Sequence, residues 1–592
     1  MKKRLLSLLC LLLAMTMLAG CAARPVSLAE TLREKLAELA ERIAAGDEIR
    51  NPQRLKFSEI PYERADMDAF AADIEAVKTA LDDGAALAEV EALLDRCMDD
   101  YDHFYTMYNL ANICNSRDLR DEYYAAEFEW YGSQDSVVLK LFDELYYACS
   151  LSPLGAELEG DYFWEGFCEE YDDPAESKYS DETVALMQRE SELISRYREL
   201  VADPVVDYRG EERSVYELLD ELSGLSYLAV LQSYHEKYNE QLAEVYIDLM
   251  RVHGEMAEAM GYSCAEDMQY DYYFERDYTP EEAAVFIGNV KEYIVPLSVW
   301  ADERQLDYRA GASPMSRDEL YDALRRVAKD IGGDCAEAFD FMSRYEFYDI
   351  EPDVYKADTS FEIYLSEYDS PFIFLNPTGT SEDLLTFVHE FGHYTDAYVN
   401  FNANESLDLA ECFSQGLEYL SLGHMSGFLD EEEIEALRLG LMLDAMSNFV
   451  QQCAFASFES KAHALGPDAL DAETLNALAL QSAKDFGFCP AGYEGLFQYF
   501  WMDIPHLFEY PFYVISYPVS LDIALQLYEL ELEEEGKGLE KYFEILPRDY
   551  DSFMETVEMG GLTNPFAEGG LRRAAAAIAE SIGYDGPLAQ AA

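Results

Sequence analysis

The segment Thr380-Ser-Glu-Asp-Leu-Leu-Thr-Phe-Val-His-Glu-Phe-Gly-His393 contains the pattern His-Glu-x-x-His in a stretch that we expect to be helical. Residues 380–383 match a capping box, and apolar residues follow at helical spacing. Side chains four positions apart lie on one face of a helix, so His389 and His393 can direct their imidazoles at a single metal ion. Glu390 is turned about 100° from His389, which places it beside such an ion, free to take a proton from an attacking water molecule.

The His-Glu-x-x-His pattern is rare by chance. The chain has only 8 histidines, and two of them four apart with an acid in second place should arise randomly in about one chain in a hundred. The alternative interpretation is a pair of ordinary histidines in the core or on the surface.

A second predicted helix supplies the candidate third ligand. Catalytic zinc sites usually have three protein ligands and one open position. The segment 407–418 has a helical pattern and follows a polar turn at 402–405, and it carries Glu411 18 residues after His393. That length allows the chain to end one helix, turn and return beside it, so we expect Glu411 to complete the site.

Four other residues in these two helices fit this arrangement. Gly392 and Gly416 are small enough to let the two helices approach closely. Asp408 and Glu418 share a helix face with Glu411 and could accept hydrogen bonds from the ligand histidines. Solvated carboxylates are an equally good interpretation of these two acids.

The segment 360–375, directly before the motif, breaks the helical pattern. It alternates and is rich in β-branched and aromatic residues, with a turn signal at Asp369-Ser-Pro371. We expect a β-hairpin here.

Most of the remaining chain has helical periodicity. The pattern runs from about residue 65 to 201, stops at Asp203-Pro204, and resumes near Val215. We therefore divide the chain into a signal at 1–20, an N-terminal helical region at 21–204 and a catalytic region at 205–592.

The N-terminus resembles a bacterial lipoprotein signal. A basic start at Met1-Lys-Lys-Arg4 precedes an apolar run of about 14 residues, which ends in Leu18-Ala-Gly-Cys21. The run is too short for a comfortable transmembrane helix, and no later segment is long and apolar enough for one. The resemblance implies cleavage before a lipid-modified Cys21, so we expect an extracytoplasmic protein anchored to the bacterial membrane only through this lipid. The alternative is an ordinary secretory signal with a cysteine there by chance.

The charge of the chain excludes several partners. The formal net charge is −76 and the pI is about 4.1, which argues against binding to nucleic acid or lying flat on anionic lipid. This charge serves solubility or attracts cationic ligands. The cysteines show no C-x-x-C pair, and we expect most of the nine beyond Cys21 to be buried free thiols.

Three segments carry a resemblance to a known family. The first is 371–393, which contains Asn-Pro-Thr-Gly-Thr before the metal motif. The second is 249–262 together with 277–282. The third is His506-Leu-Phe-Glu-Tyr-Pro-Phe-Tyr-Val-Ile-Ser-Tyr517. All three resemble the oligoendopeptidase F and thimet oligopeptidase family of zinc metallopeptidases, and the resemblance covers roughly residues 210–590.

The resemblance implies a mainly α-helical, two-lobed fold with a deep central channel and a small β-sheet beside the metal. It implies one Zn²⁺ per chain and short, unfolded peptides as substrates, because a narrow channel excludes folded proteins. It also implies that His506 hydrogen-bonds the tetrahedral intermediate, with Tyr513 and Tyr517 as candidate partners and Tyr510 as a weaker one.

The functional hypothesis is therefore a zinc-dependent endopeptidase that hydrolyses short oligopeptides outside the cytoplasm. One alternative is a lipid-anchored peptide-binding protein with a structural zinc and no turnover. The presence of Glu390 argues against it, since binding alone needs no general base. A second alternative is an exopeptidase that trims one end of its substrate, and a third, weaker one is a purely structural surface lipoprotein.

Overall fold

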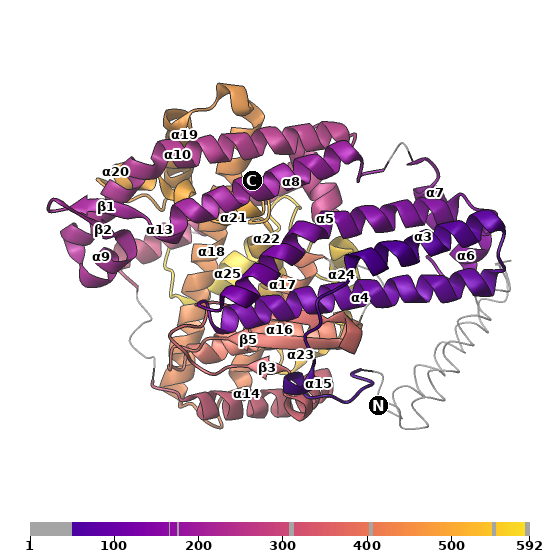
Figure 1. Cartoon of the computed structure of the whole chain (residues 1–592). Coiled ribbons are helices and arrows are strands. Elements are labelled where there is room, and N and C mark those ends of the chain that lie inside the picture. Colours follow the sequence, from indigo (N-terminus) through magenta and orange to yellow (C-terminus); the bar gives the residue numbers. More distant parts are fainter. Residues whose placement is uncertain are drawn as a thin grey trace.

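The computed structural model describes residues 50–164, 166–174, 177–306, 313–401, 406–547 and 552–586. These residues form a mainly helical fold with two small sheets (Figure 1), which confirms the predicted fold class. The proposed signal and Cys21 lie outside the described residues.

Long helices make up the N-terminal part of the fold. Helices α3, α4 and α5 pack side by side, and α8 packs along α10 (Gly224–Ala259) across the top of the view in Figure 1. Because α8 and α10 lie on either side of residue 204 in the sequence, the two predicted regions are in contact, and the division between them stays a prediction. The elements of this part are η1 (Phe57–Glu59), α3 (Met67–Asp83), α4 (Leu87–Arg117), α5 (Glu122–Ser150), α6 (Gly155–Asp161), α7 (Phe167–Glu170) and α8 (Asp181–Ala202).

Helix α3 shows how the local sequence specifies these elements. The Asp66 carboxylate accepts hydrogen bonds from the backbone N–H groups of Asp68 and Ala69 and so caps the first turn. Gly84 ends the helix with φ +70°, a left-handed conformation that costs glycine little. Between these ends the buried side chains recur every three or four residues: Phe70, Ile74, Val77 and Leu81.

The middle of the chain continues with helices and a two-stranded sheet. Strands β1 and β2 are antiparallel. The elements are β1 (Val205–Tyr208), β2 (Glu211–Ser214), α9 (Val215–Glu221), α10 (Gly224–Ala259), α11 (Ala265–Met268), η3 (Gln269–Tyr273), α12 (Pro280–Asn289), η4 (Val290–Ile294), α13 (Val295–Arg304), α14 (Arg317–Ile331) and α15 (Gly333–Tyr345).

The predicted hairpin is present as β4 (Ser360–Leu365) and β5 (Ser370–Leu375), which pair antiparallel. The turn differs from the prediction: η5 (Ser366–Tyr368) and Asp369 (φ +45°) reverse the chain, and Pro371 lies within β5. A third strand, β3 (Tyr348–Asp349), pairs parallel to β5, so the strand order is β3-β5-β4. Strand β4 is therefore an edge of the sheet, and both β4 and β5 contact α16 (Asp383–Asn400).

Helices α16, α17 and α22 form the centre of the C-terminal part, where α17 packs against both of the others. The elements are α16 (Asp383–Asn400), α17 (Leu407–Ser421), η6 (Leu422–His424), α18 (Glu431–Leu465), η7 (Pro467–Ala469), α19 (Ala472–Asp485), α20 (Glu494–Phe497), η8 (Phe500–Asp503), α21 (His506–Glu509), α22 (Ser516–Glu533), α23 (Lys537–Ile545), α24 (Phe553–Met559) and α25 (Arg572–Ser581).

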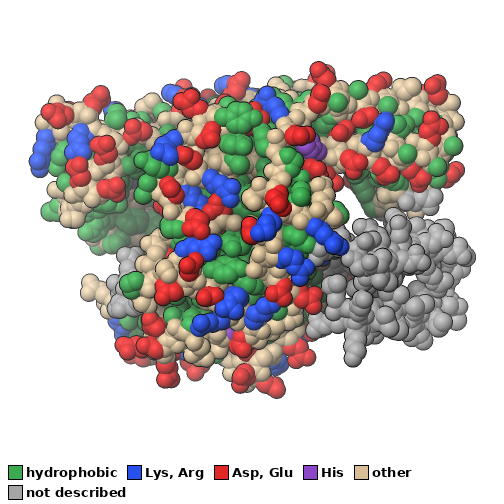
Figure 2. All heavy atoms as spheres, turned by 60° about the horizontal axis from the view of Figure 1, so that its bottom comes forward, with side chains coloured by type: hydrophobic (Ala, Val, Ile, Leu, Met, Phe, Trp, Pro, Cys, Tyr) green, Lys and Arg blue, Asp and Glu red, His purple; other side chains and the backbone are tan. Residues whose placement is uncertain are grey.

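The acidic surface and the buried thiols agree with what the sequence predicts. Figure 2 shows Asp and Glu side chains scattered over one face and interspersed with Lys and Arg. Within the described part, none of the nine cysteines forms a disulfide, and five of them are buried, as predicted. Within this part, no helix is long and apolar enough to cross a membrane.

Candidate metal centre

Helices α16 and α17 approach closely at Gly392. A Cβ atom at this position would lie 2.5 Å from Ser414 Cα and 2.8 Å from the Phe413 carbonyl oxygen, so only glycine fits between the two backbones. Gly416 does not serve the same contact, contrary to the prediction: its open side faces Leu527 of α22 and Tyr542 of α23. One glycine therefore sets the spacing of α16 and α17.

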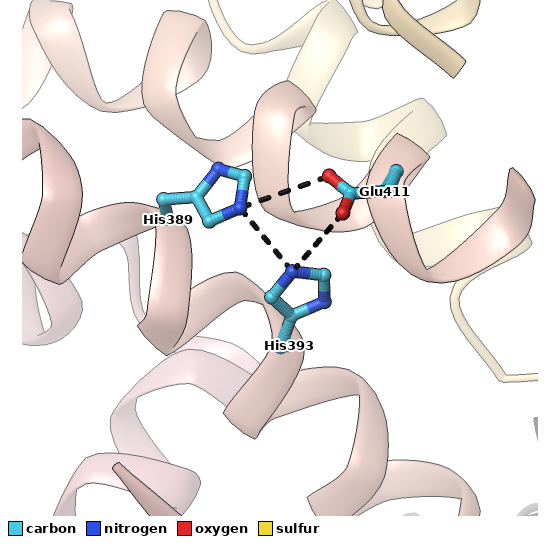
Figure 3. Close-up of side chains that lie close together, drawn as sticks. All are labelled: His389, His393 and Glu411. Atoms are coloured by element: carbon cyan, nitrogen blue, oxygen red, sulfur yellow. Dashed lines mark hydrogen bonds and ion pairs between the residues drawn. The ribbon is translucent and has the colours of Figure 1, made fainter. Parts of the chain in front are cut away.

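Three side chains converge across this contact (Figure 3). His389 and His393 extend from α16, and their Nε2 atoms lie 3.3 Å apart. Glu411 extends from α17, with its carboxylate oxygens 3.7 Å from Nε2 of His389 and 3.9 Å from Nε2 of His393. Among the described residues, this is the one group of three acids, histidines or cysteines whose ligand atoms all lie within 4.8 Å of one another.

These distances and donor types fit a zinc ion. Zinc binds histidine nitrogen and carboxylate oxygen at about 2.0–2.2 Å in tetrahedral geometry, which places neighbouring ligand atoms about 3.3–3.6 Å apart. The measured separations equal or slightly exceed that range. Two imidazoles and one carboxylate also leave one tetrahedral position open for solvent or substrate.

Glu418 orients the first ligand histidine. Its carboxylate lies 2.7 Å from Nδ1 of His389, so Nδ1 carries the proton and Nε2 faces the metal position. Burial opposes a charge on this ring, but Glu418, Glu411 and Glu390 outweigh it and raise the pKa of His389 to about 10.

The other predicted orienting residue, Asp408, has a different role. Its carboxylate lies 3.6 Å from Nε of Arg276, and both side chains are buried. Arg276 Nη2 donates to the carbonyl oxygen of Phe512 at 3.0 Å and to Oγ of Ser516 at 2.8 Å. Phe512 has φ +64°, a strained value for a residue with a bulky side chain. Arg276 thus joins α17 to the turn before α22. The sequence gives no sign of this link, because Arg276 stands there as a single arginine in an aromatic segment.

The start of α16 also differs from the prediction. The 380–383 capping box is absent, because Glu382 stands at the cap position with no side-chain hydrogen bond to the helix. Instead, the Asp383 carboxylate accepts from the backbone N–H groups of Thr378, Gly379 and Thr380. Asp383 thereby fixes the loop that leads from β5 into α16, the helix that carries the two candidate ligand histidines.

Glu390 is buried beside the metal position, with 5% of its surface exposed. A second carboxyl group, Glu362 of β4, lies near it. Burial and the charges of Glu390 and Asp396 raise the pKa of Glu362 to about 8, so Glu362 is mostly protonated at neutral pH. The strand pattern gave no reason to single out Glu362.

The predicted histidine and tyrosines form a cluster. The ring of His506 stacks on that of Tyr513 at 5.4 Å between centroids, and its Nε2 lies 3.2 Å from the Tyr517 hydroxyl. Burial lowers the pKa of His506, which keeps the imidazole neutral at pH 7. Burial, with the charges of Glu411 and Glu390, raises the pKa of Tyr517 to about 12. The Tyr517 phenol is therefore a hydrogen-bond donor close to the candidate metal ligand Glu411. Tyr510 is 56% exposed at the edge of the cluster.

The Gly392 contact yields a stability prediction. Gly392→Ala forces α16 and α17 apart and should lower the free energy of unfolding by about 1–3 kcal/mol, with loss of bound zinc. Gly416→Ala is the matched control, because its Cβ would meet Leu527 Cδ1 at 3.5 Å, an ordinary contact, and alanine favours the helix. Thermal unfolding and metal analysis of both variants measure the predicted losses of stability and of bound zinc. Equal stability and zinc content in the two variants would contradict the spacing role of Gly392.

Sequence comparisons with known proteins all point to one peptidase family. A sequence profile described as "Peptidase family M3" matches residues 336–575, and one described as "Peptidase M3 N-terminal domain" matches residues 57–167. An oligoendopeptidase F homolog of Lactococcus lactis subsp. lactis (strain IL1403) is 23% identical over 544 residues, covering 81% of this chain and 88% of the relative. An oligopeptidase PepF of Bacillus subtilis (strain 168) is 27% identical over 186 residues, covering 30% of this chain and 28% of the relative.

Two solved structures show the same fold. PZ peptidase A in complex with an inhibitor superposes with a TM-score of 0.76 at 23% identity, covering 90% of this chain and all of that chain. Oligoendopeptidase F from Enterococcus faecium superposes with a TM-score of 0.56 at 16% identity, covering 87% and 96% of the two chains.

Proposed function

We infer that this chain, which belongs to the peptidase M3 family as a zinc metallopeptidase of the oligoendopeptidase type, cleaves internal bonds of short, unfolded peptides outside the cytoplasm. The observation that carries the chemistry is the convergence of two imidazoles and one carboxylate, with a buried glutamate next to the first histidine. The oligopeptidase names of the relatives support peptides as substrates.

His389, His393 and Glu411 would hold one zinc ion per chain. When bound in such a site, zinc lowers the pKa of a water molecule toward about 7 and polarises a carbonyl group. Glu390 takes the proton of the attacking water at its carboxylate and passes it to the leaving amine. Nε2 of His506 and the Tyr517 hydroxyl donate hydrogen bonds to the developing oxyanion, and Tyr513 holds the His506 ring by stacking.

The oxyanion role predicts a selective loss of turnover in His506→Ala. Because the bond strengthens only in the transition state, kcat should fall about 10²–10³-fold while KM changes little. Steady-state kinetics on one peptide check this, and Tyr510→Phe, at the exposed edge of the cluster, is the control with wild-type kcat. An unchanged kcat in His506→Ala would remove His506 from the mechanism.

A mixed peptide pool tests the function itself. Incubation with and without a chelator, followed by mass spectrometry, should give internal fragments that vanish when the metal is removed. A ladder of products shortened from one end would indicate an exopeptidase. A pool that stays intact, with peptides bound, would indicate a peptide-binding protein without turnover.

The proposed location rests on the N-terminal sequence alone, since residues 1–49 lie outside the described part. Cleavage after Gly20 would leave Cys21 as a lipid-modified first residue. Expression of the full chain in a bacterium, with a labelled fatty acid in the medium, should give a labelled protein in the membrane fraction. Cys21→Ser should abolish the label, and a soluble, unlabelled wild-type protein would contradict the anchor.

A further inference from the structure

One buried arginine contacts both halves of the candidate active site. Arg276 follows η3 in an aromatic segment, and its side chain is fully buried. On one side, its Nε atom lies 3.6 Å from the Asp408 carboxylate of α17. On the other side, its Nη2 atom donates hydrogen bonds to the chain between α21 and α22. The guanidinium therefore bridges the helix that carries Glu411 and the turn that carries Tyr513.

The hydrogen bonds from Arg276 to this turn lie next to the two tyrosines that stand beside His506 in sequence analysis and structure. The acceptors are the Phe512 carbonyl oxygen at 3.0 Å and the Ser516 hydroxyl at 2.8 Å. Phe512 directly precedes Tyr513, and Ser516 directly precedes Tyr517. Because a peptide unit is planar, a bond that fixes the Phe512 carbonyl also fixes the plane of the next amide. The two bonds thus hold the backbone at both tyrosines.

The backbone of this turn is strained and needs such support. Phe512 has φ +64°, a value that persists in a bulky residue only where the surrounding structure enforces it. The aromatic rings beside Arg276 add to the restraint. The Phe274 ring lies 5.9 Å from that of Tyr513, and its centroid lies 4.6 Å from the guanidinium carbon. The arginine and its aromatic segment therefore pack on the turn as one unit.

The other end of the link lies close to the candidate metal ligand. Asp408 is three residues before Glu411, which is about one turn of α17. Its side chain is buried, and its carbonyl oxygen accepts a hydrogen bond from the Ser520 hydroxyl of α22 at 2.8 Å. Arg276 thus holds the turn against the part of α17 that carries the ligand, and this contact sets the distance between the metal position and the oxyanion donors.

We propose that Arg276 is a positioning residue for peptide hydrolysis. It holds the turn at 510–515 so that His506 and Tyr517 already face the oxyanion when the peptide carbonyl is attacked. Donors placed in advance stabilise a developing charge without moving during the reaction. A guanidinium suits this role because its planar fork fixes several partners in a set geometry, which the ammonium group of lysine does not. The inference rests on the proposed peptidase function and adds a residue that acts through the turn.

Arg276→Lys tests this role and keeps a positive charge beside Asp408. On one peptide, kcat should fall about 10–100-fold while KM changes less than about threefold, because small displacements of donors act mainly on the transition state. Zinc content should stay at one ion per chain. Arg117→Lys is the matched control, because Arg117 pairs with Asp349 in a contact between α4 and β3. This control should keep the wild-type kcat.

A background without the oxyanion donors distinguishes positioning from general stability. In His506→Ala/Tyr517→Phe, the further change Arg276→Lys should lower kcat by no more than about twofold, because no donor is left to position. A residue that only stabilises the fold would lower kcat by the same factor in both backgrounds. Single-turnover assays with excess enzyme measure these low rates.

A second variant covers the case in which Arg276→Lys does not fold. Arg276→Gln/Asp408→Asn removes both buried charges together, so no unpaired charge remains in the core. The same loss of kcat is expected, again confined to the background that has both donors. Thermal unfolding shows that each variant used is folded.

Wild-type kcat in the folded variants would overturn the inference, and so would an equal loss of kcat in the two backgrounds. Loss of zinc together with kcat would overturn it as well, because Arg276 would then support the metal ligands and not the turn. The proposed peptidase function fails separately, if the wild-type enzyme loaded with zinc cuts no peptide.

Discussion

Glu390→Gln should bind zinc as the wild type does and lose nearly all turnover. Glutamine has the shape of glutamate but cannot accept the proton of the attacking water, so kcat should fall about 10²–10⁴-fold, the usual contribution of a general base. Because Glu390 lies beside the metal position and is not among the converging ligand atoms, metal content should stay near one ion per chain. Kinetics and metal analysis on the same protein sample check the loss of turnover and the unchanged zinc content.

Glu362→Gln is the matched control for this experiment. It replaces the neighbouring buried carboxyl group, which is already mostly protonated at neutral pH, with a neutral group of the same size. Glu362→Gln should therefore keep most of the activity. Wild-type turnover in Glu390→Gln would refute its role as the general base.

Glu411→Ala should lose both zinc and activity. Without the carboxylate, His389 and His393 are the remaining protein ligands, and two ligands do not hold zinc at low free concentrations. We expect the zinc content to fall from about one ion per chain to near zero, with a matching loss of peptide cleavage.

Glu418→Gln distinguishes a residue that orients a ligand histidine from a residue that binds the zinc itself. It keeps a hydrogen-bond acceptor for Nδ1 of His389 but removes the charge, so zinc affinity should fall about 10–100-fold while excess zinc restores binding. Glu411→Ala should show little such recovery. Full zinc content in Glu411→Ala would show that another residue is the third ligand.

The sequence was a good guide wherever local geometry decides the outcome. The spacing of His389 and His393 on one helix follows from the helical repeat, and alternation in 360–375 predicts a hairpin because both faces of a strand follow a period of two. The position of Gly392 at the contact of α16 and α17 was also predictable, because only glycine permits a close backbone approach.

Other features depend on residues that are distant in the chain. Asp408 was interpreted either as a hydrogen-bond acceptor for a candidate ligand histidine or as a solvated carboxylate, but it is buried beside Arg276, and no local pattern links the two. Asp383 was predicted as part of a capping box, whereas the loop before it folds back so that its backbone amides reach the carboxylate. Gly416 faces α22 and α23 because the packing of the later helices sets its surroundings. Tertiary contacts therefore decide the surroundings of Asp408 and Gly416, whereas Asp383 is held by the loop directly before it.

A crystal of the full chain grown with zinc, measured on both sides of the zinc absorption edge, would show directly which atoms bind the metal. We expect one strong anomalous peak per chain, about 2.0–2.2 Å from Nε2 of His389, Nε2 of His393 and a carboxylate oxygen of Glu411. A peak bound elsewhere, or a peak at the two histidines with Glu411 turned away and another side chain in its place, would contradict it.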